Sequence, residues 1–489
     1  MSKTTIQYKD IAPGAAETAV FRSGDAADFS TLDDLRRENE TQPISALELN
    51  NWLLDGKHTI HGGQTVPFWS NALSDGDCAF SEPPVLDIAL PDQYSSFGVT
   101  LSFDQTVGNF CSEINIKWYQ QATLKADADF HPDANTYFCQ RRAEAYDRIV
   151  ITFKKTWLPY RRVKLHQIIF GIYRTFGMTE IRSAKITSQI NHISTEVPIS
   201  TLSWTLDVRE DIDFMFQLKQ PVEVRNDDFL IGVYYISEHK RKAKSVYDLR
   251  SQDAIGILND DTFPGGVYTN YSAKQLLKDI IDGNFDIVFA EDGGEIVADT
   301  NLTGIIQPMS RRNAIQQVAF AWGVCIATDG GNVIRVFRPS DVPEDIGVGR
   351  TYTGATVETA AIVTAVRVTA HTYTQNAEGN VEINGIKYQD TTTVYTVTNP
   401  NVTASDKQNV KEITGATLVS PGIGQATAQK VYDYYTRRNT TRGKIVWKGE
   451  LLGDCVTIPN SWGKPSTGNI SKMDYVLSNT VAATVEVVS

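Results

Sequence analysis

The sequence predicts a mainly β protein of several domains, with a β-sandwich first, then antiparallel barrels, and a small α+β segment between the barrels. Its 489 residues are too many for one hydrophobic core and imply roughly three or four domains. Most of the chain consists of short runs in which apolar and polar residues alternate, separated by Gly, Pro, Asn and Asp. This texture is typical of antiparallel β-structure.

The amino-acid composition and net charge argue against several classes of function. Apolar residues make up 41% and charged residues 21%, and no apolar stretch is long enough to span a membrane. The polar N-terminus, MSKTTIQYKD, predicts no secretory signal, so we expect the chain to be made in a cytoplasm. A net charge of −12 argues against binding to nucleic acid, and we expect the basic runs at 160–164 and 239–244 to be solvated strand ends or loops.

The residues that carry enzymatic chemistry form no recognisable motif. The five cysteines are scattered without a CxxC pair, which argues against a disulfide framework and a zinc site. His58 and His61 form an isolated HxxH without further ligands, and no GxSxG or HExxH is present. We therefore expect a protein that is not an enzyme and that holds no metal or cofactor. A glycosidase carboxylate pair stays open, because such residues meet in space and not at a fixed spacing.

The chain divides into five predicted segments by changes in residue pattern. Residues 1–45 form a polar arm with a short helix from Thr31, and a second helix is expected from Ser45. Residues 46–172 carry the alternating runs GVTLSFD, INIKWY, RIVITFKK and VKLHQIIFG, which predict an eight-stranded jelly roll of about 125 residues. Trp118 is expected to point inward from its strand.

The remaining segments are 173–258, 259–338 and 339–489. The first predicts an open antiparallel barrel. The second is an α+β unit with helices that begin at Ser272 and near Ser310, each ending at a glycine. The third is again β, with one helix at about 425–438. Its glycine cluster PGIGQA is expected to be a loop leading into that helix, and GGNVIRV a hairpin turn.

Two family resemblances follow from these runs. FWSNAL, PPVLDIALP, GVTLSFD, EINIKWY, IVITFKK and PYRRVKLHQIIFG resemble, in that order, the galactose-binding-like jelly rolls and carbohydrate-binding modules of phage tail proteins. The resemblance implies an aromatic sugar platform in the loop KKTWLPYRR, formed by Trp157 and Tyr160. The alternative is that the tryptophan beside a proline only fastens the loop to the core.

The second resemblance covers most of 173–489. It rests on LIGVYYISEHKRKAKSVYDLRSQDAIGIL, GIIQPMSRRNAIQQVAFAWGVCIATDGGNVIRV and GDCVTIPNSWGKPSTGNISKMDYVL, which resemble the hub proteins of phage baseplates and their relatives in long non-contractile tails. The resemblance implies two tube-like β-barrel domains in each subunit and a homotrimeric, pseudo-six-fold ring through which DNA or a tape measure protein passes. An acidic lumen would then repel the phosphate backbone.

The hub resemblance also implies a place and a set of partners. The protein would be a structural component of the virion tail, at the baseplate or tail tip. Its neighbours would be the tail tube or distal tail protein, spike or tail fibre proteins, and the tape measure protein. Two alternatives remain open, a tail adhesin that binds a host cell-surface glycan and, with less support, a cell-wall hydrolase.

Overall fold

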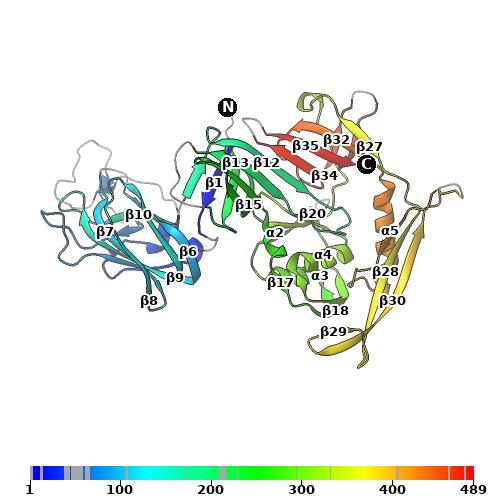
Figure 1. Ribbon diagram of the computed structural model, residues 1–489, viewed down its shortest axis with the longest axis horizontal. Coiled ribbons are helices and arrows are strands. Elements are labelled where there is room, and N and C mark those ends of the chain that lie inside the picture. The colour runs from blue at the N-terminus through cyan, green and yellow to red at the C-terminus, as the bar shows by residue number, and fades with distance from the viewer. Residues whose placement is uncertain are drawn as a thin grey trace. The chain divides into compact units, whose positions relative to one another are not determined.

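A computed structural model describes the fold and divides the chain into two compact units. The described residues are 4–11, 15–37, 44–45, 59–60, 66–104, 108–171, 173–208, 216–227, 229–292, 295–330, 332–403, 407–460, 463–477 and 481–489. The N-terminal unit comprises Gln7–Thr175 and Asp213–Pro221, and the C-terminal unit comprises Met1–Ile6, Phe176–Ile212 and Val222–Ser489. Strands far outnumber helices in both units, which confirms the mainly β fold class (Figure 1).

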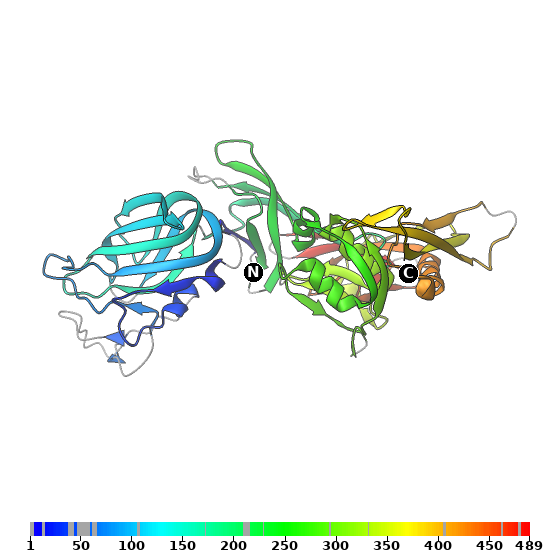
Figure 2. The same ribbon diagram turned by 90° about the horizontal axis from the view of Figure 1, so that it is seen from below.

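The N-terminal unit is one curved antiparallel sheet wrapped around an apolar core (Figure 2). The sheet follows the order β5-β10-β6-β9-β7-β8, and β2 pairs with β6. The pairing of the long strands β6 and β9 shifts register between Ala89 and Gly98, where bulges bend the sheet. The strands are β2 (Val20–Arg22), β5 (Phe68–Trp69), β6 (Val85–Phe103), β7 (Cys111–Gln120), β8 (Thr123–Phe130), β9 (Thr136–Thr156) and β10 (Lys164–Phe170).

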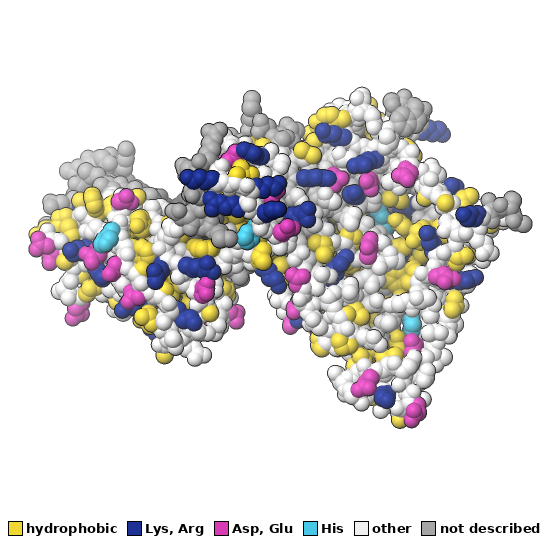
Figure 3. Space-filling view, viewed as in Figure 1, with side chains coloured by type: hydrophobic (Ala, Val, Ile, Leu, Met, Phe, Trp, Pro, Cys, Tyr) yellow, Lys and Arg dark blue, Asp and Glu magenta, His cyan; other side chains and the backbone are white. Residues whose placement is uncertain are grey.

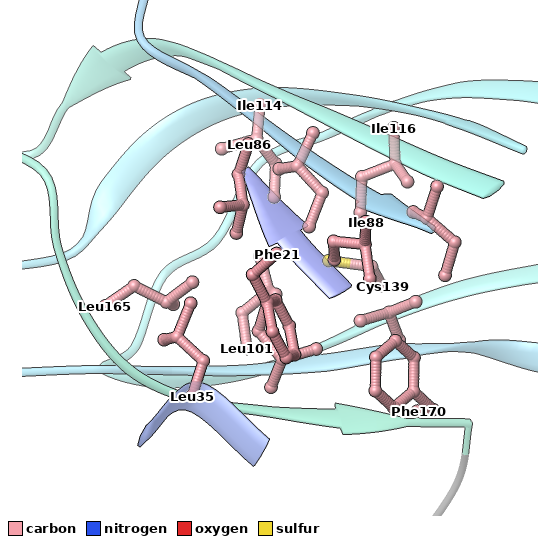
Figure 4. Close-up of a cluster of buried hydrophobic side chains, with 14 of the residues drawn as sticks. Phe21, Leu35, Leu86, Ile88, Leu101, Ile114, Ile116, Cys139, Leu165 and Phe170 are labelled. Carbon is pink, nitrogen blue, oxygen red and sulfur yellow. The ribbon is translucent and has the colours of Figure 1, made fainter. Parts of the chain in front are cut away.

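Apolar residues from all parts of this sheet meet in its interior. Figure 4 shows Leu86 of β6, Ile116 of β7, and Leu165 and Phe170 of β10 in one cluster of buried side chains. Trp118 is fully buried, as the alternation in INIKWY predicted. Two segments before the sheet, α1 (Ala15–Thr18) and the 3-10 helix η1 (Leu32–Arg36), add Ala15 and Leu35 to the same core.

The short helix predicted from Thr31 is present as the 3-10 helix η1, but the Thr31 side chain makes no capping hydrogen bond. The segment is too short for i to i−4 bonding to continue. The helix expected from Ser45 lies outside the described residues, apart from Ser45 itself, which belongs to the two-residue strand β3 (Ile44–Ser45) paired with β4 (Thr59–Ile60).

The C-terminal unit is built on a large sheet with the order β14-β15-β16-β13-β12-β34-β35-β32-β27. Residues Thr4–Ile6 of β1 (Thr4–Lys9) extend it beyond β14, β33 pairs with β34, and β26 pairs with β33. The short strand β11 (Tyr173–Phe176) marks the entry of the chain into this unit. The other strands are β12 (Ile181–Gln189), β13 (Thr201–Asp207), β14 (Pro221–Asn226), β15 (Phe229–Arg241), β16 (Val246–Gln252), β26 (Pro343–Asp345), β27 (Thr356–Thr359), β32 (Asn439–Val446), β33 (Cys455–Ile458), β34 (Ser466–Val476) and β35 (Ala482–Val488).

A small α+β portion of this unit contains the two helices expected from their capping residues. Helix α3 (Ala273–Ile281) begins after Ser272, whose hydroxyl accepts from the N–H of Gln275, and α4 (Arg311–Trp322) begins after Ser310 in the same way. They pack beside α2 (Ala254–Asn259) around a shared apolar cluster. The strands here are β17 (Thr262–Phe263), β18 (Gly266–Ser272), β19 (Ile287–Phe289), β20 (Glu291–Asp292), β21 (Glu295–Ile296), β22 (Asn301–Ile306), β23 (Met309–Ser310), β24 (Cys325–Thr328) and β25 (Ile334–Phe337).

A four-stranded sheet with the order β29-β30-β28-β31 completes the C-terminal unit, and α5 runs along β28 and β30 (Figures 1 and 2). Helix α5 starts at Pro421, so PGIGQA is the first turn of the helix and not the loop that was predicted. Proline at this position has no N–H that would need a partner. The elements are η2 (Val348–Arg350), β28 (Ala365–Gln375), β29 (Val381–Ile383), β30 (Ile386–Thr398), β31 (Val410–Ile413) and α5 (Pro421–Thr436).

Candidate functional surfaces

One strand pair joins segments of the C-terminal unit that lie far apart in the sequence. Strand β12 pairs antiparallel with β34, with Thr187 opposite Asp474 and Gln189 opposite Lys472. The pairing makes one continuous sheet from the strands of the predicted barrel at 173–258 and those of 339–489. The two predicted barrels therefore share a single layer.

The two faces of this sheet differ in chemistry. Side chains alternate between faces along each strand, and Ile186, Trp204, Met473 and Val485 are buried on one of them. The opposite face, which we call the polar face, is traced by the residues that stand opposite one another across the strands. They are Glu238, Lys240, Asp248, Arg250, Ser203, Thr205, Lys185, Thr187, Lys472, Asp474, Thr484, Glu486, Arg442 and Lys444.

Charge on the polar face is close to balance. Six of its residues are basic and four acidic, a difference of +2 on a chain whose total is −12. Figure 3 shows Lys and Arg side chains in rows over this part of the unit. The acidic lumen suggested by the overall composition is therefore not a property of this surface.

Most charges on the polar face are paired with a neighbour on the next strand. Lys185 lies 3.3 Å from Asp474, and Lys472 lies 3.7 Å from Glu486. Arg250 lies 3.6 Å from Glu238. Exposed pairs of this kind add little stability, but they leave few charges free to hold a passing molecule.

The polar face has little exposed apolar surface. On strands β12, β13, β16, β32, β34 and β35, Val476 at the end of β34 is the one large apolar side chain that is more than a third exposed. Hydroxyl groups of serine and threonine lie between the ion pairs. The surface is therefore well hydrated and lacks the aromatic anchors that typify tight protein interfaces.

The residues predicted to bind sugar lie in the connection between β9 and β10 of the N-terminal unit. Trp157 is 55% exposed and stacks on Phe110, with ring centroids 5.1 Å apart. Its backbone N–H donates to the Phe110 carbonyl at 2.9 Å. Tyr160 is 38% exposed and has a positive φ of 58°. Both side chains reach the surface of the N-terminal unit.

Each ring nitrogen of His371 has an oxygen atom within hydrogen-bonding distance. His371 Nδ1 lies 2.9 Å from Asp390 Oδ2, and Nε2 lies 3.0 Å from the Thr414 carbonyl oxygen. Among the residues that the structure describes, no three His, Cys, Asp or Glu side chains gather in a way that would hold a metal ion. His58 and His61 are outside that set.

Sequence reasoning did not find the polar face. The outward residues of β12 are visible in IRSAKITSQ as Ser183, Lys185 and Thr187, which alternate with the buried Ala184 and Ile186. What the sequence lacks is the identity of the neighbouring strand, because β34 lies almost 300 residues away along the chain.

In the described part of the chain, no helix has the length and apolar character that a membrane crossing needs.

Comparisons with known proteins give structural similarities only. No family model and no curated protein matches the sequence. A tail protein from Neisseria meningitidis has 13% identity and a TM-score of 0.47, covering 65% of this chain and 94% of its own. The 43 kDa tail protein of a Shewanella oneidensis prophage has 11% identity and a TM-score of 0.45, with 65% and 95% covered.

A prophage tail protein from Listeria monocytogenes has 13% identity and a TM-score of 0.41, covering 64% of this chain and 91% of its own.

Proposed function

We propose that this chain is a structural baseplate hub protein of a phage or phage-like tail, located at the tail tip and without enzymatic activity. In this proposal three copies form a ring that joins the tail tube to the tip or spike. The observation that carries the proposal is the β12–β34 pairing, which makes one wide sheet with a buried apolar face and a hydrated, charge-balanced face.

A sheet of this kind suits the wall of a conduit. The wall must be a continuous layer, and its inner surface must not bind the polymer that moves past it. The ion pairs of Lys185 with Asp474 and of Lys472 with Glu486 leave the basic groups compensated within the protein. A phosphate backbone or an extended tape measure protein would then meet water, hydroxyls and satisfied charges.

The partners follow from this arrangement. The ends of the ring would contact the tail tube or distal tail protein on one side and spike or tail fibre proteins on the other. Closed rings of identical subunits use head-to-tail contacts, so different edges of the C-terminal unit would meet in neighbouring copies.

The test is the mass of the purified full-length chain by light scattering, together with negative-stain images of the same sample. A three-fold ring with a central hole is the expected result. Labelling then locates the polar face, with Thr484→Cys as the probe and Val342→Cys, at a 75% exposed position, as the matched control. A bulky maleimide should react more slowly with the first than with the second in the ring, while a small maleimide should react with both.

A chain that stays monomeric, alone and with its tail tube protein, would contradict the hub. Equal labelling of both cysteines by the bulky reagent in a ring would contradict the inward position of the polar face. Four of the five natural cysteines are buried and Cys78 is partly exposed, so the unmodified chain is measured alongside as the background.

A second candidate function is binding of a host-surface glycan by the N-terminal unit. The observation in its favour is Trp157, which is 55% exposed although its ring is held in place by the stack on Phe110. A rigid, exposed indole is the kind of surface on which a sugar ring packs. The test is a glycan screen on the full-length chain.

A further inference from the structure

The outer edge of strand β30 is unpaired over most of its length. On its inner side β30 pairs with β28 over eleven consecutive positions, from Ala365 opposite Thr398 to Gln375 opposite Tyr388, without a register shift. On its outer side β29 covers only Ile386–Tyr388. From residue 391 to 398 no described strand lies against that side.

The direction of the backbone groups at this edge follows from one hydrogen bond. The N–H of Asp390 donates to Asn380 Oδ1 at 3.0 Å, on the side of β30 that faces away from β28. Backbone groups alternate in direction along an antiparallel strand. The N–H and C=O groups of Thr392, Val394 and Thr396 therefore face the same open side.

Two edge strands of this protein carry features that discourage pairing with a further strand. The edge strand β8 carries Lys125, Asp127 and Asp129, and β27 is only four residues long and contains Glu358. Natural proteins use such charges, short strands, prolines and bulges to prevent unwanted pairing. The edge of β30 from 391 to 398 reads TTTVYTVT, without a charge, proline or bulge.

One face of this part of β30 packs against helix α5, which holds the strand in place. Tyr395 and Val397 pack on the cluster that contains Ala428 and Val431 of α5, and the Tyr395 hydroxyl donates to the Pro421 carbonyl at 2.9 Å. The alternate residue Val394 is 56% exposed on the other face. A rigid edge loses little entropy when another strand is added to it.

We propose that the edge of β30 from residue 391 to 398 is a docking site for an extended, uncharged segment of another polypeptide, which adds to the sheet as a strand. Strand β29 already pairs with the beginning of this edge of β30. The occupant would pair with the following residues on the same side, through the same kind of backbone hydrogen bonds. A neutral, β-branched segment matches the exposed threonines and Val394 in chemistry. The proposal does not rest on the hub function.

The test uses the full-length chain and, as the probe, a short fluorescent peptide of alternating threonine and valine with a lysine at each end. Fluorescence anisotropy measures binding, and hydrogen exchange locates it. Binding and slowed exchange over residues 391–398 are expected, and the same peptide with every backbone nitrogen methylated should not bind. Binding of both peptides alike, or of neither, overturns the proposal.

Substitutions at Val394 make the test specific for the edge. Val394→Pro removes an N–H that faces away from β28, so the β28–β30 ladder stays intact, and binding should weaken about tenfold or more. Val394→Lys adds a protecting charge and should act in the same direction if the proline variant fails to fold. The matched control Val394→Thr keeps the N–H and should bind within about twofold of the original chain.

A second copy of this chain is the other possible occupant, and the same variants identify it. Self-association of the unmodified chain that Val394→Pro abolishes, with the peptide unable to compete, would overturn the proposed occupant in favour of a copy of the chain.

Discussion

Thr187 Oγ1 donates a hydrogen bond of 2.7 Å to Asp474 Oδ1, joining residues 287 positions apart across β12 and β34. Burial by itself would raise the pKa of Asp474, but the hydrogen bonds from Thr187 and Lys185 and the charge of Lys472 hold this pKa below its ordinary value. The ionised carboxylate therefore stabilises the fold above its unfolded-state pKa, and this contribution is lost as the pH falls through the lowered value.

Thr187→Val should destabilise the C-terminal unit by about 1–2 kcal/mol, because it leaves a largely buried carboxylate oxygen without its hydroxyl donor. Chemical denaturation at neutral pH measures the change in the free energy of unfolding. The control is Thr201→Val on the exposed side of β13, which should change stability by less than about 0.5 kcal/mol. Equal effects of the two substitutions would show that the hydrogen bond across β12 and β34 is unimportant.

Two glycines in the first turns of α5 should respond in opposite directions to alanine. A Cβ at Gly424 would lie 2.4 Å from ring carbons of Tyr395, so Gly424→Ala should cost about 1–3 kcal/mol. At Gly422 the nearest atom, Ser420 Oγ, is 3.8 Å from the added Cβ. Gly422→Ala should therefore be neutral or stabilise by up to about 1 kcal/mol through helix propensity.

Thermal unfolding followed by circular dichroism measures both variants. A stable Gly424→Ala protein would mean that Tyr395 moves aside without cost, and that α5 is not held tightly against β30.

His192 should make the C-terminal unit less stable in mild acid. Burial, with a smaller effect of the Arg437 charge, lowers the pKa of this histidine to about 4, and its ring lies against Tyr434 with centroids 5.7 Å apart. Between the ordinary pKa of 6.5 and about 4 the unfolded chain takes up a proton that the folded chain does not. Stability is therefore lost as the pH falls through this range, by up to about 3 kcal/mol.

His192→Phe keeps a ring against Tyr434 and removes the titrating group. The variant should lose less stability than the original chain between pH 7 and pH 4.5, as measured by denaturant unfolding at both values. An unchanged difference between the two pH values would show that His192 is not the source of acid sensitivity.

Trp157→Ala should abolish any sugar binding found in a glycan screen, because it removes the exposed ring that is stacked on Phe110. The matched control is Leu124→Ala in β8 of the same unit, which removes a 49% exposed apolar side chain outside the β9–β10 connection. Titration calorimetry with the best sugar compares the two variants. Unchanged affinity in Trp157→Ala would exclude this residue as the platform and leave the role of fastening the loop.

Local sequence signals determined several elements of this protein. Ser272 and Ser310 are followed by apolar residues at helical spacing, and both helices begin where these caps predict, because a capping hydrogen bond involves only residues within one turn. Strict alternation in INIKWY likewise determined that Trp118 points inward. The exposed position of Trp157 and Tyr160 agrees with their place in a turn-rich connection.

Elements without a strong local signal depended on their surroundings. The capping-box pattern at Thr31 is followed by a 3-10 helix in which Leu35 is buried in the core of the N-terminal unit, and Thr31 makes no capping hydrogen bond. The glycines of PGIGQA suggested a loop, but they lie in helix α5. Gly424 is needed there because only a residue without a side chain fits beneath Tyr395.

The sequence by itself therefore determined the mainly β class, the two capped helices and the inward position of Trp118, since these depend on neighbours a few positions away. Only the tertiary structure decided that β12 meets β34, that the charges on their outer side are compensated, and that the outer side of β30 is left open. The physical reason is that strand pairing is made by backbone groups that every residue carries, so the alternation of side chains tells which face is buried but not which strand lies alongside.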